Sequence, residues 1–186
     1  MPKLRRTITL VLGGARSGKS RHAQELASKF RRVVFLATLR PLDPEMRTKI
    51  ARHRRDRPSG WRTVEAPLHL AEAIRSESRN ADVLLVDCFT LFVSNFMRLG
   101  RQAETHNQRY IRELCQAIRK SRSSVIAVSN EVGSGIVPAF RSGRVYRDLL
   151  GQLNQEVAAI ADNVLLMVAG LPMPLKSRRR SAREPK

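Results

Sequence analysis

Eight consecutive residues near the start of the chain match the pattern G-x-x-x-x-G-K-[ST], which binds the phosphates of a nucleotide. The segment consists of Gly13, Gly14, Ala15, Arg16, Ser17, Gly18, Lys19 and Ser20. Glycines let successive backbone N–H groups turn toward a triphosphate, and the lysine adds a positive charge near the β and γ oxygens. The serine hydroxyl is a suitable ligand for Mg²⁺. We therefore expect this loop to bind a nucleoside triphosphate.

Asp87 follows the apolar run Val83 to Val86. An acid at the end of a buried strand is the second part expected of a site that hydrolyses or transfers phosphates, because it orders Mg²⁺ directly or through water. Many buried strands end in Asp, so this signal is weak alone and gains weight from the phosphate loop. We expect Ser20 and Asp87 to hold the metal ion.

His53 lies in a run of cations between Lys49 and Arg57. Nearby positive charge disfavours the imidazolium form, which leaves a ring nitrogen free to act as a nucleophile, and arginines can neutralise phosphate oxygens. Two other interpretations stay open on the residues alone. Met46, Ile50 and His53 share one helical face, as in a packed core, and the arginines can form a solvated basic face.

Short apolar runs alternate with helical patterns along the chain, which predicts an α/β fold with a mostly parallel central sheet and helices on both faces. The expected strands are 8–12, 33–37, 83–86, 124–128 and 164–168, and the expected helices are 18–30, 43–57, 67–78, 90–99, 106–121 and 142–162. No repeat or linker divides residues 7–170. We therefore expect one domain over residues 1–172, with the phosphate loop between the first strand and the first helix.

The chain of 186 residues carries a net charge of +19, which predicts attraction to polyanions without naming a partner. Residues 173–186 are rich in Lys and Arg and lack apolar periodicity, so we expect a disordered tail that either solubilises the protein or binds polyanions. No apolar stretch is long enough to cross a bilayer, and the two cysteines fit no zinc or disulfide spacing. We expect a cytoplasmic protein without a membrane span.

Seven segments in succession carry a family resemblance: residues 13–22, 35–38, 43–46, 50–58, 61–65, 129–138 and 146–155. Together they resemble the bifunctional adenosylcobinamide kinase / adenosylcobinamide-phosphate guanylyltransferase family of cobalamin biosynthesis, over about residues 7–172. The phosphate loop is shared with many NTPases, whereas the Asn-Glu-Val-Gly-x-Gly-Ile-Val-Pro segment at 130–138, together with the His-x-x-x-Arg-Pro segment at 53–58, is specific. The resemblance implies a P-loop NTPase-like fold and a homotrimer.

The family resemblance also implies two reactions. ATP or GTP phosphorylates adenosylcobinamide, and GMP from GTP then passes through a guanylyl-histidine to adenosylcobinamide phosphate, giving adenosyl-GDP-cobinamide. The histidine maps to His53. The triphosphate maps to the loop at 13–20, and the remaining GTP-lining positions map to Ala37, Thr38, Leu39, Arg54, Arg55, Asp56, Arg57, Glu65 and Asp87.

Several alternatives remain at this point. Glu65 can read the N1–H and N2 amino edge of guanine, or it can be an ordinary glutamate of an edge strand. The glycines of residues 130–135 indicate close approach of a ligand or of a neighbouring subunit. The chain can also be an enzyme that retains one of the two activities. A basic NTP-dependent nucleic-acid binder is the third hypothesis, and the scarcity of aromatic residues argues against it.

Overall fold

The computed structural model describes residues 5–40 and 58–177. Its centre is a seven-stranded sheet with the order β3-β2-β4-β5-β1-β6-β7. The strands are β1 (Ile8–Gly13), β2 (Val33–Ala37), β3 (Arg62–Glu65), β4 (Val83–Asp87), β5 (Ser124–Asn130), β6 (Asn163–Val168) and β7 (Leu171–Lys176). Strand β7 pairs antiparallel with β6, whereas the other pairings are parallel. The expectation of a mostly parallel sheet is confirmed.

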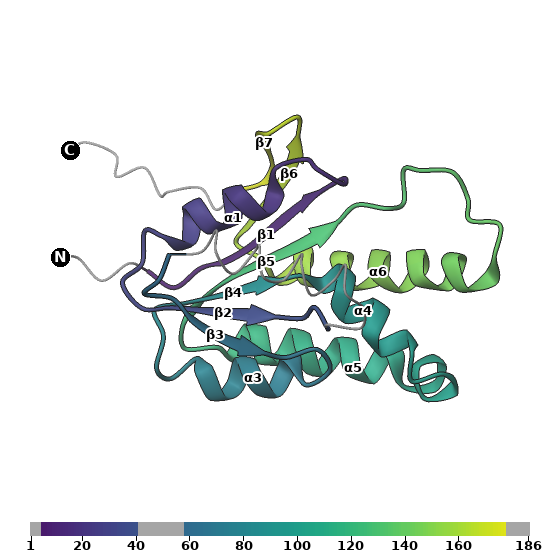
Figure 1. Ribbon diagram of the computed structural model, residues 1–186, viewed down its shortest axis with the longest axis horizontal. Helices are drawn as coiled ribbons and strands as arrows, with labels where there is room; N and C mark the ends of the chain where they lie inside the picture. The colour runs from purple at the N-terminus through teal and green to yellow at the C-terminus, as the bar shows by residue number, and fades with distance from the viewer. Residues whose placement is uncertain (1–4, 41–57, 178–186) are drawn as a thin grey trace, which may run out of the picture.

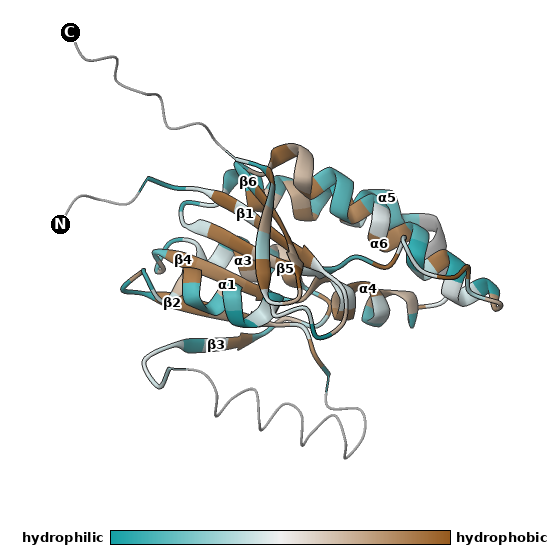
Figure 2. Cartoon of the chain, turned by 90° about the horizontal axis from the view of Figure 1, so that it is seen from above, coloured by the Kyte–Doolittle hydropathy of each residue, from teal (hydrophilic) through white to brown (hydrophobic). Residues whose placement is uncertain are grey.

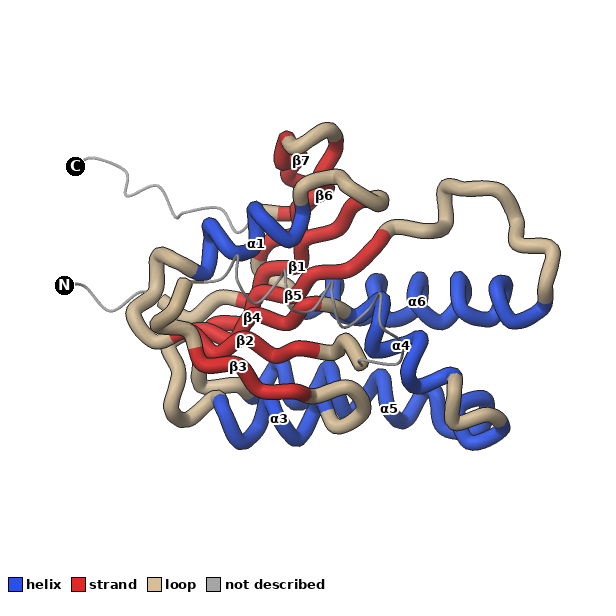
Figure 3. Tube along the Cα trace, in the orientation of Figure 1, coloured by secondary structure: helices blue, strands red, loops and turns tan. Residues whose placement is uncertain are grey.

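Helices cover the two faces of the sheet unequally (Figures 1 and 3). Helix α1 (Lys19–Ala27) lies on one face, over a core cluster formed by residues such as Val11, Phe35 and Val128. The other face carries α3 (Leu70–Glu77), α4 (Phe89–Met97), α5 (Arg101–Lys120) and α6 (Arg141–Ile160). The predicted helix at 43–57 lies outside the described residues. Among those residues, no helix is long and apolar enough to cross a membrane.

The inner strands consist of continuous apolar runs because both of their faces are covered. In β4, the four apolar residues Val83 to Val86 are buried, and the strand ends with the half-buried Asp87. Figure 2 shows this burial as a difference in hydropathy, with apolar strands at the centre and polar residues on the helices around them. This arrangement brings the carboxyl ends of β1 to β6 to one edge of the sheet, and loops leave from that edge.

Two strands were missing from the expectations, and both lie at the edges of the sheet. Strand β3 has only four residues, which are partly or fully exposed, so it lacks an apolar run. Strand β7 contains Pro172 and Pro174 and is exposed throughout. A proline is tolerated on an edge strand because one side of that strand needs no donor.

The boundary of the domain also needs correction. Residues 173–176, which the sequence predicts to be part of the tail, belong to β7, and this strand pairs with β6 as far as Lys176, which is in register with Val164. The Lys176 ammonium donates hydrogen bonds to the carbonyls of Ala158 and Ala159 at the end of α6. The folded part therefore continues beyond residue 172.

Candidate nucleotide-binding site

The phosphate loop joins β1 to α1, as the sequence predicts. Gly18 precedes the helix with a φ of +88°, a left-handed conformation that favours glycine. A Cβ atom built on Gly13 would lie 2.4 Å from the Ser17 Oγ and 2.8 Å from the Met167 carbonyl oxygen. The glycines therefore allow a tight turn that packs closely against β6. The first N–H groups of a helix have no partner within that helix, and the N-terminus of a helix such as α1 therefore attracts anions.

The turn between β6 and β7 supports this loop through a backbone hydrogen bond. The Gly170 N–H, between β6 and β7, donates to the Ser17 carbonyl at 3.1 Å. The Ser17 hydroxyl is buried and has no hydrogen-bond partner among the described residues, which is unusual for a buried polar group and is consistent with a ligand that supplies one. The loop is thus held in shape by the protein while one of its hydroxyls is left for a partner.

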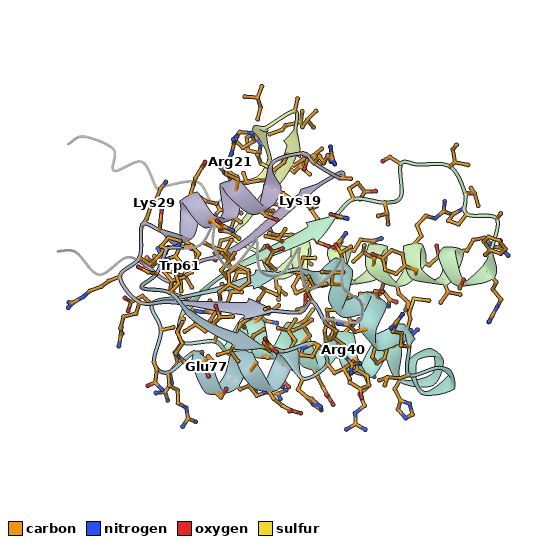
Figure 4. All side chains as sticks on the ribbon, in the orientation of Figure 1. Lys19, Arg21, Lys29, Arg40, Trp61 and Glu77 are labelled. Carbon is orange, nitrogen blue, oxygen red and sulfur yellow. The ribbon has the colours of Figure 1, made fainter. Side chains whose placement is uncertain are left out.

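Lys19 lies at the start of α1, above the carboxyl ends of the strands (Figure 4). Its ammonium donates to the Gly14 carbonyl at 2.8 Å. Partial burial lowers the pKa of Lys19 below its usual value, and the charge of Asp87 opposes that shift. A phosphate group would supply the negative charge that this partly dehydrated ammonium favours.

Ser20 and Asp87 come together across the sheet edge, with 3.5 Å between Ser20 Oγ and Asp87 Oδ1. A hydroxyl and a carboxylate are hard oxygen donors of the kind that Mg²⁺ prefers. Within the described residues no group of three or more His, Cys, Asp or Glu side chains could hold a metal. Mg²⁺ fits this sparse set because it keeps several waters and takes its other ligands from substrate phosphates.

Parallel pairing places other predicted site residues beside Asp87. Ala37, the last residue of β2, is in register with Asp87 on one side and with Glu65 on the other. Glu65 is exposed at the carboxyl end of the edge strand β3, so both of its earlier interpretations stay open. Leu39 follows in the loop and is half-buried. Arg40, which the sequence did not single out, comes from the same loop (Figure 4).

Thr38 is fully buried, and its polar groups have partners inside the protein. Its hydroxyl donates to the Cys88 carbonyl at 2.7 Å and accepts the Cys88 N–H at 2.8 Å. The amide of Asn95 donates to the Thr38 carbonyl at 2.7 Å and to the Pro67 carbonyl at 3.2 Å. Thr38 therefore ties three loops together and fixes the residue after Asp87. Asn95, a polar residue within the apolar helix α4, is the sequence feature that could have indicated this network.

Five of the predicted site residues lie outside the described residues: His53, Arg54, Arg55, Asp56 and Arg57. The structure therefore places Ser20 of the phosphate loop beside Asp87 and aligns Ala37 and Glu65 with Asp87 along the same edge of the sheet. The predicted nucleophile and its arginines stay predictions. Burial raises the pKa of the nearby Cys88 thiol to about 11, so this group stays neutral beside the carboxylate.

The sheet, the glycine-rich turn into α1 and the opposed carboxylate define a nucleotide-binding protein of the P-loop class. Two solved structures share the fold. A protein of Pyrococcus horikoshii OT3 matches with a TM-score of 0.55 at 13% identity, covering 96% of this chain and 91% of that one. An ATPase from the type III secretion system of pathogenic bacteria matches with a TM-score of 0.53 at 14% identity, covering 92% of this chain and 57% of that one.

Sequence comparison narrows the class to a family. Residues 9–175 match the family described as cobinamide kinase / cobinamide phosphate guanyltransferase. The bifunctional adenosylcobalamin biosynthesis protein CobU of Escherichia coli (strain K12) is 40% identical over 180 residues, covering 91% of this chain and 99% of the relative. The bifunctional adenosylcobalamin biosynthesis protein CobP of Pseudomonas aeruginosa is 44% identical over 168 residues, covering 90% of this chain and 96% of the relative. The chain belongs to the cobinamide kinase / cobinamide phosphate guanyltransferase family.

Proposed function

We propose that this enzyme performs both reactions of its family. It phosphorylates the hydroxyl of adenosylcobinamide with ATP or GTP, and it then transfers GMP from GTP to adenosylcobinamide phosphate. The observation that carries the proposal is the phosphate loop facing Asp87 at the sheet edge, in a chain whose bifunctional relatives match nearly end to end. Residues 13–20 would hold the triphosphate, with Ala37 and Glu65 beside it.

In the kinase reaction, the oxygen of the substrate hydroxyl forms a bond to the γ-phosphorus while the bond to the β,γ-bridging oxygen breaks, and the hydroxyl proton is released to water. Lys19 and the N–H groups at the start of α1 stabilise the charge that moves onto the phosphate oxygens. Ser20 and Asp87 would hold Mg²⁺, which supplies further positive charge at the β and γ oxygens when bound. The loop geometry is thus suited to positioning and electrostatic stabilisation, which dominate phosphoryl transfer.

In the guanylyl transfer, a ring nitrogen of His53 would attack the α-phosphorus of GTP and pyrophosphate would leave. A phosphate oxygen of adenosylcobinamide phosphate would then attack the same phosphorus, and the P–N bond would break to return the imidazole. Two in-line steps replace one difficult displacement between two phosphates. Support for His53 comes from the family resemblance and from the cationic residues around it in the sequence, with Arg54, Arg55 and Arg57 as partners for phosphate oxygens.

The nucleophile is tested by incubating the protein with α-³²P-GTP and Mg²⁺ and then denaturing it. We expect acid-labile, base-stable label on the wild-type chain and on His69→Ala, a control at an exposed histidine before α3, and no label on His53→Ala. Adenosylcobinamide phosphate should discharge the label. Label that persists on His53→Ala would refute the assignment, and a labelled protein without kinase activity would indicate a single-activity enzyme.

A nucleic-acid binder is a weaker candidate that rests on the net charge of +19. It predicts salt-sensitive binding of RNA or DNA and no GMP adduct. Mg²⁺ dependence stays a prediction from the phosphate loop and Asp87, and a cytoplasmic location stays a prediction from the short apolar stretches of the sequence. The homotrimer stays a prediction from the family resemblance. Support for assembly comes from the segment before α6, where Ile136 is 97% exposed and Phe140 is 80% exposed, because exposed apolar side chains gathered in one place are typical of interaction surfaces.

A further inference from the structure

Asn130 lies at the carboxyl edge of the sheet, and the proposed function gives this residue no role. It ends β5 in register with Gly13 of the phosphate loop. On the other side of β5, Asp87 is in register with Val128. Strand β5 thus runs between the strand that carries the loop and the strand that carries the carboxylate. Asn130 therefore lies beside both halves of the candidate site.

The face on which Asn130 lies follows from alternation along the strand. Val128 packs in the core cluster that includes Ala23 and Ala27 of α1. Side chains two residues apart point to the same face of a sheet. The side chain of Asn130 is therefore directed to the face of α1, where the phosphate loop and Lys19 lie. It is half-buried, which leaves part of it open to a ligand.

The backbone of Asn130 is fixed from two helices. Its N–H donates to the Thr90 hydroxyl of α4 at 2.9 Å, and its carbonyl accepts from the Asn154 amide of α6 at 3.0 Å. The Tyr146 hydroxyl donates in turn to the Thr90 carbonyl at 3.2 Å, and the next N–H along the chain, that of Glu131, donates to the Gly13 carbonyl at 3.1 Å. Precise placement of a residue by supporting hydrogen bonds is typical of functional sites.

We propose that Asn130 is a further catalytic residue, whose side-chain NH₂ group donates a hydrogen bond to the terminal phosphate of the bound nucleotide during transfer. A neutral amide donor suits this place because Lys19 already supplies the positive charge, and donors aimed at developing charge are most effective in the transition state. The inference rests on the proposed function and gives a role to the first residue of the Asn-Glu-Val-Gly segment. Thr90 and Asn154, which form hydrogen bonds with its backbone, are positioning residues.

The test compares Asn130→Ala and the isosteric Asn130→Asp with Asn80→Ala, an exposed asparagine before β4 at the opposite edge. We expect both Asn130 variants to lower kcat for cobinamide phosphorylation about 10- to 100-fold, with the Kd for GTP changed by less than about threefold. Asn80→Ala should behave as wild type. An Asn130→Asp variant with wild-type kcat would overturn the proposal, because the aspartate lacks the donor.

A second measurement separates this inference from the proposed function. GDP with aluminium fluoride and Mg²⁺ mimics the phosphoryl group in transfer, and its binding needs no cobinamide. Asn130→Ala should weaken this complex by about the same factor as kcat while leaving GDP binding unchanged. Wild-type protein that binds the mimic but does not phosphorylate cobinamide would refute the proposed function alone. Unchanged affinity of Asn130→Ala for the mimic would refute the role of Asn130 alone.

The supporting bonds are tested at Thr90. Thr90→Val removes the hydroxyl that holds the Asn130 N–H and should lower kcat about three- to tenfold without changing the Kd for GTP. Thr90→Ser keeps the hydroxyl and should restore kcat. Equal melting temperatures of the two variants, together with different kcat values, would support positioning of Asn130. Equal kcat values would contradict it.

Discussion

The two edges of the sheet use similar polar residues for different purposes. At the amino edge, Asp82 accepts from the Arg32 backbone and guanidinium, Asp162 accepts from the Ile8 N–H at 2.8 Å, and the Ser123 hydroxyl contacts the carbonyls of Ser78 and Ala81. These groups hold strand ends and turns in place. At the carboxyl edge, Lys19, Ser20 and Asp87 converge instead on the space in front of the phosphate loop.

The difference shows that the type of a polar residue does not reveal its role, whereas its partners do. In Figure 4, Lys29 and Glu77 lie toward the amino edge and Lys19 lies toward the other. Substitutions at the amino edge should therefore cost stability, and substitutions at the carboxyl edge should cost activity. Thr38 is the informative exception, because it lies at the carboxyl edge while its hydroxyl and carbonyl are hydrogen-bonded to the protein's own groups.

The largest effect is expected for Lys19→Ala. Loss of the ammonium should lower kcat/KM for nucleotide-dependent phosphorylation by about 10²- to 10³-fold, because a charged donor to the transferred phosphate disappears. The free energy of unfolding should change by less than about 1 kcal/mol, since the side chain is only half-buried. Lys29→Ala is the matched control and should leave both quantities unchanged. Kinase assays would compare kcat/KM of the two variants, and urea titrations would compare their free energies of unfolding. A Lys19→Ala enzyme with wild-type activity would contradict the functional role of the carboxyl edge.

Thr38→Val should affect both stability and activity. Removing the hydroxyl leaves the buried Cys88 N–H without its acceptor, which should lower the free energy of unfolding by about 1–3 kcal/mol. A shifted Asp87 should also reduce kcat, about tenfold. Thr38→Ser keeps the hydroxyl and should therefore retain most of the stability and most of kcat. A variant with normal stability and only a raised KM for nucleotide would show instead that Thr38 contacts the nucleotide directly.

Ser123→Ala should affect stability alone. Its hydroxyl lies 2.8 Å from two carbonyl oxygens in a buried turn, so its loss should cost about 1–2 kcal/mol in the free energy of unfolding. The specific activity of the folded protein should stay at the wild-type level. Ser76→Ala, at an exposed serine of α3, is the control and should cost less than about 0.5 kcal/mol. Reduced activity of folded Ser123→Ala would contradict the division between the edges.

The smallest effect is the pH dependence due to Asp82. The hydrogen bond from the Arg32 side chain holds the pKa of Asp82 below its usual value. Because the folded pKa lies below the unfolded one, this stabilisation is present above the unfolded pKa and is lost as the pH falls through the folded pKa. Asp82→Asn should therefore lose less stability than wild type between about pH 5 and pH 2. Parallel melting curves of the two proteins over this range would refute the prediction.

The phosphate loop and the five apolar strands could be predicted because their signals are local. Eight adjacent residues specify the loop, and each inner strand shows its burial in its own composition. Strands β3 and β7 were missed because an exposed edge strand carries no apolar run, and the prolines of β7 argue against a strand anywhere except at an edge. The same reasoning placed the end of the domain too early.

The sequence by itself predicted a phosphate loop at residues 13–20, with Lys19 and Ser20 as its functional side chains, and it indicated the family to which the chain belongs. Only the tertiary structure decided that Asp87 lies opposite Ser20, that Glu65 and Ala37 share its register, and that Thr38 is turned inward. The physical reason is that strand order and register depend on pairing between distant segments. Local preferences select a strand or a turn, whereas the position of one strand end beside another depends on the packing of the whole sheet.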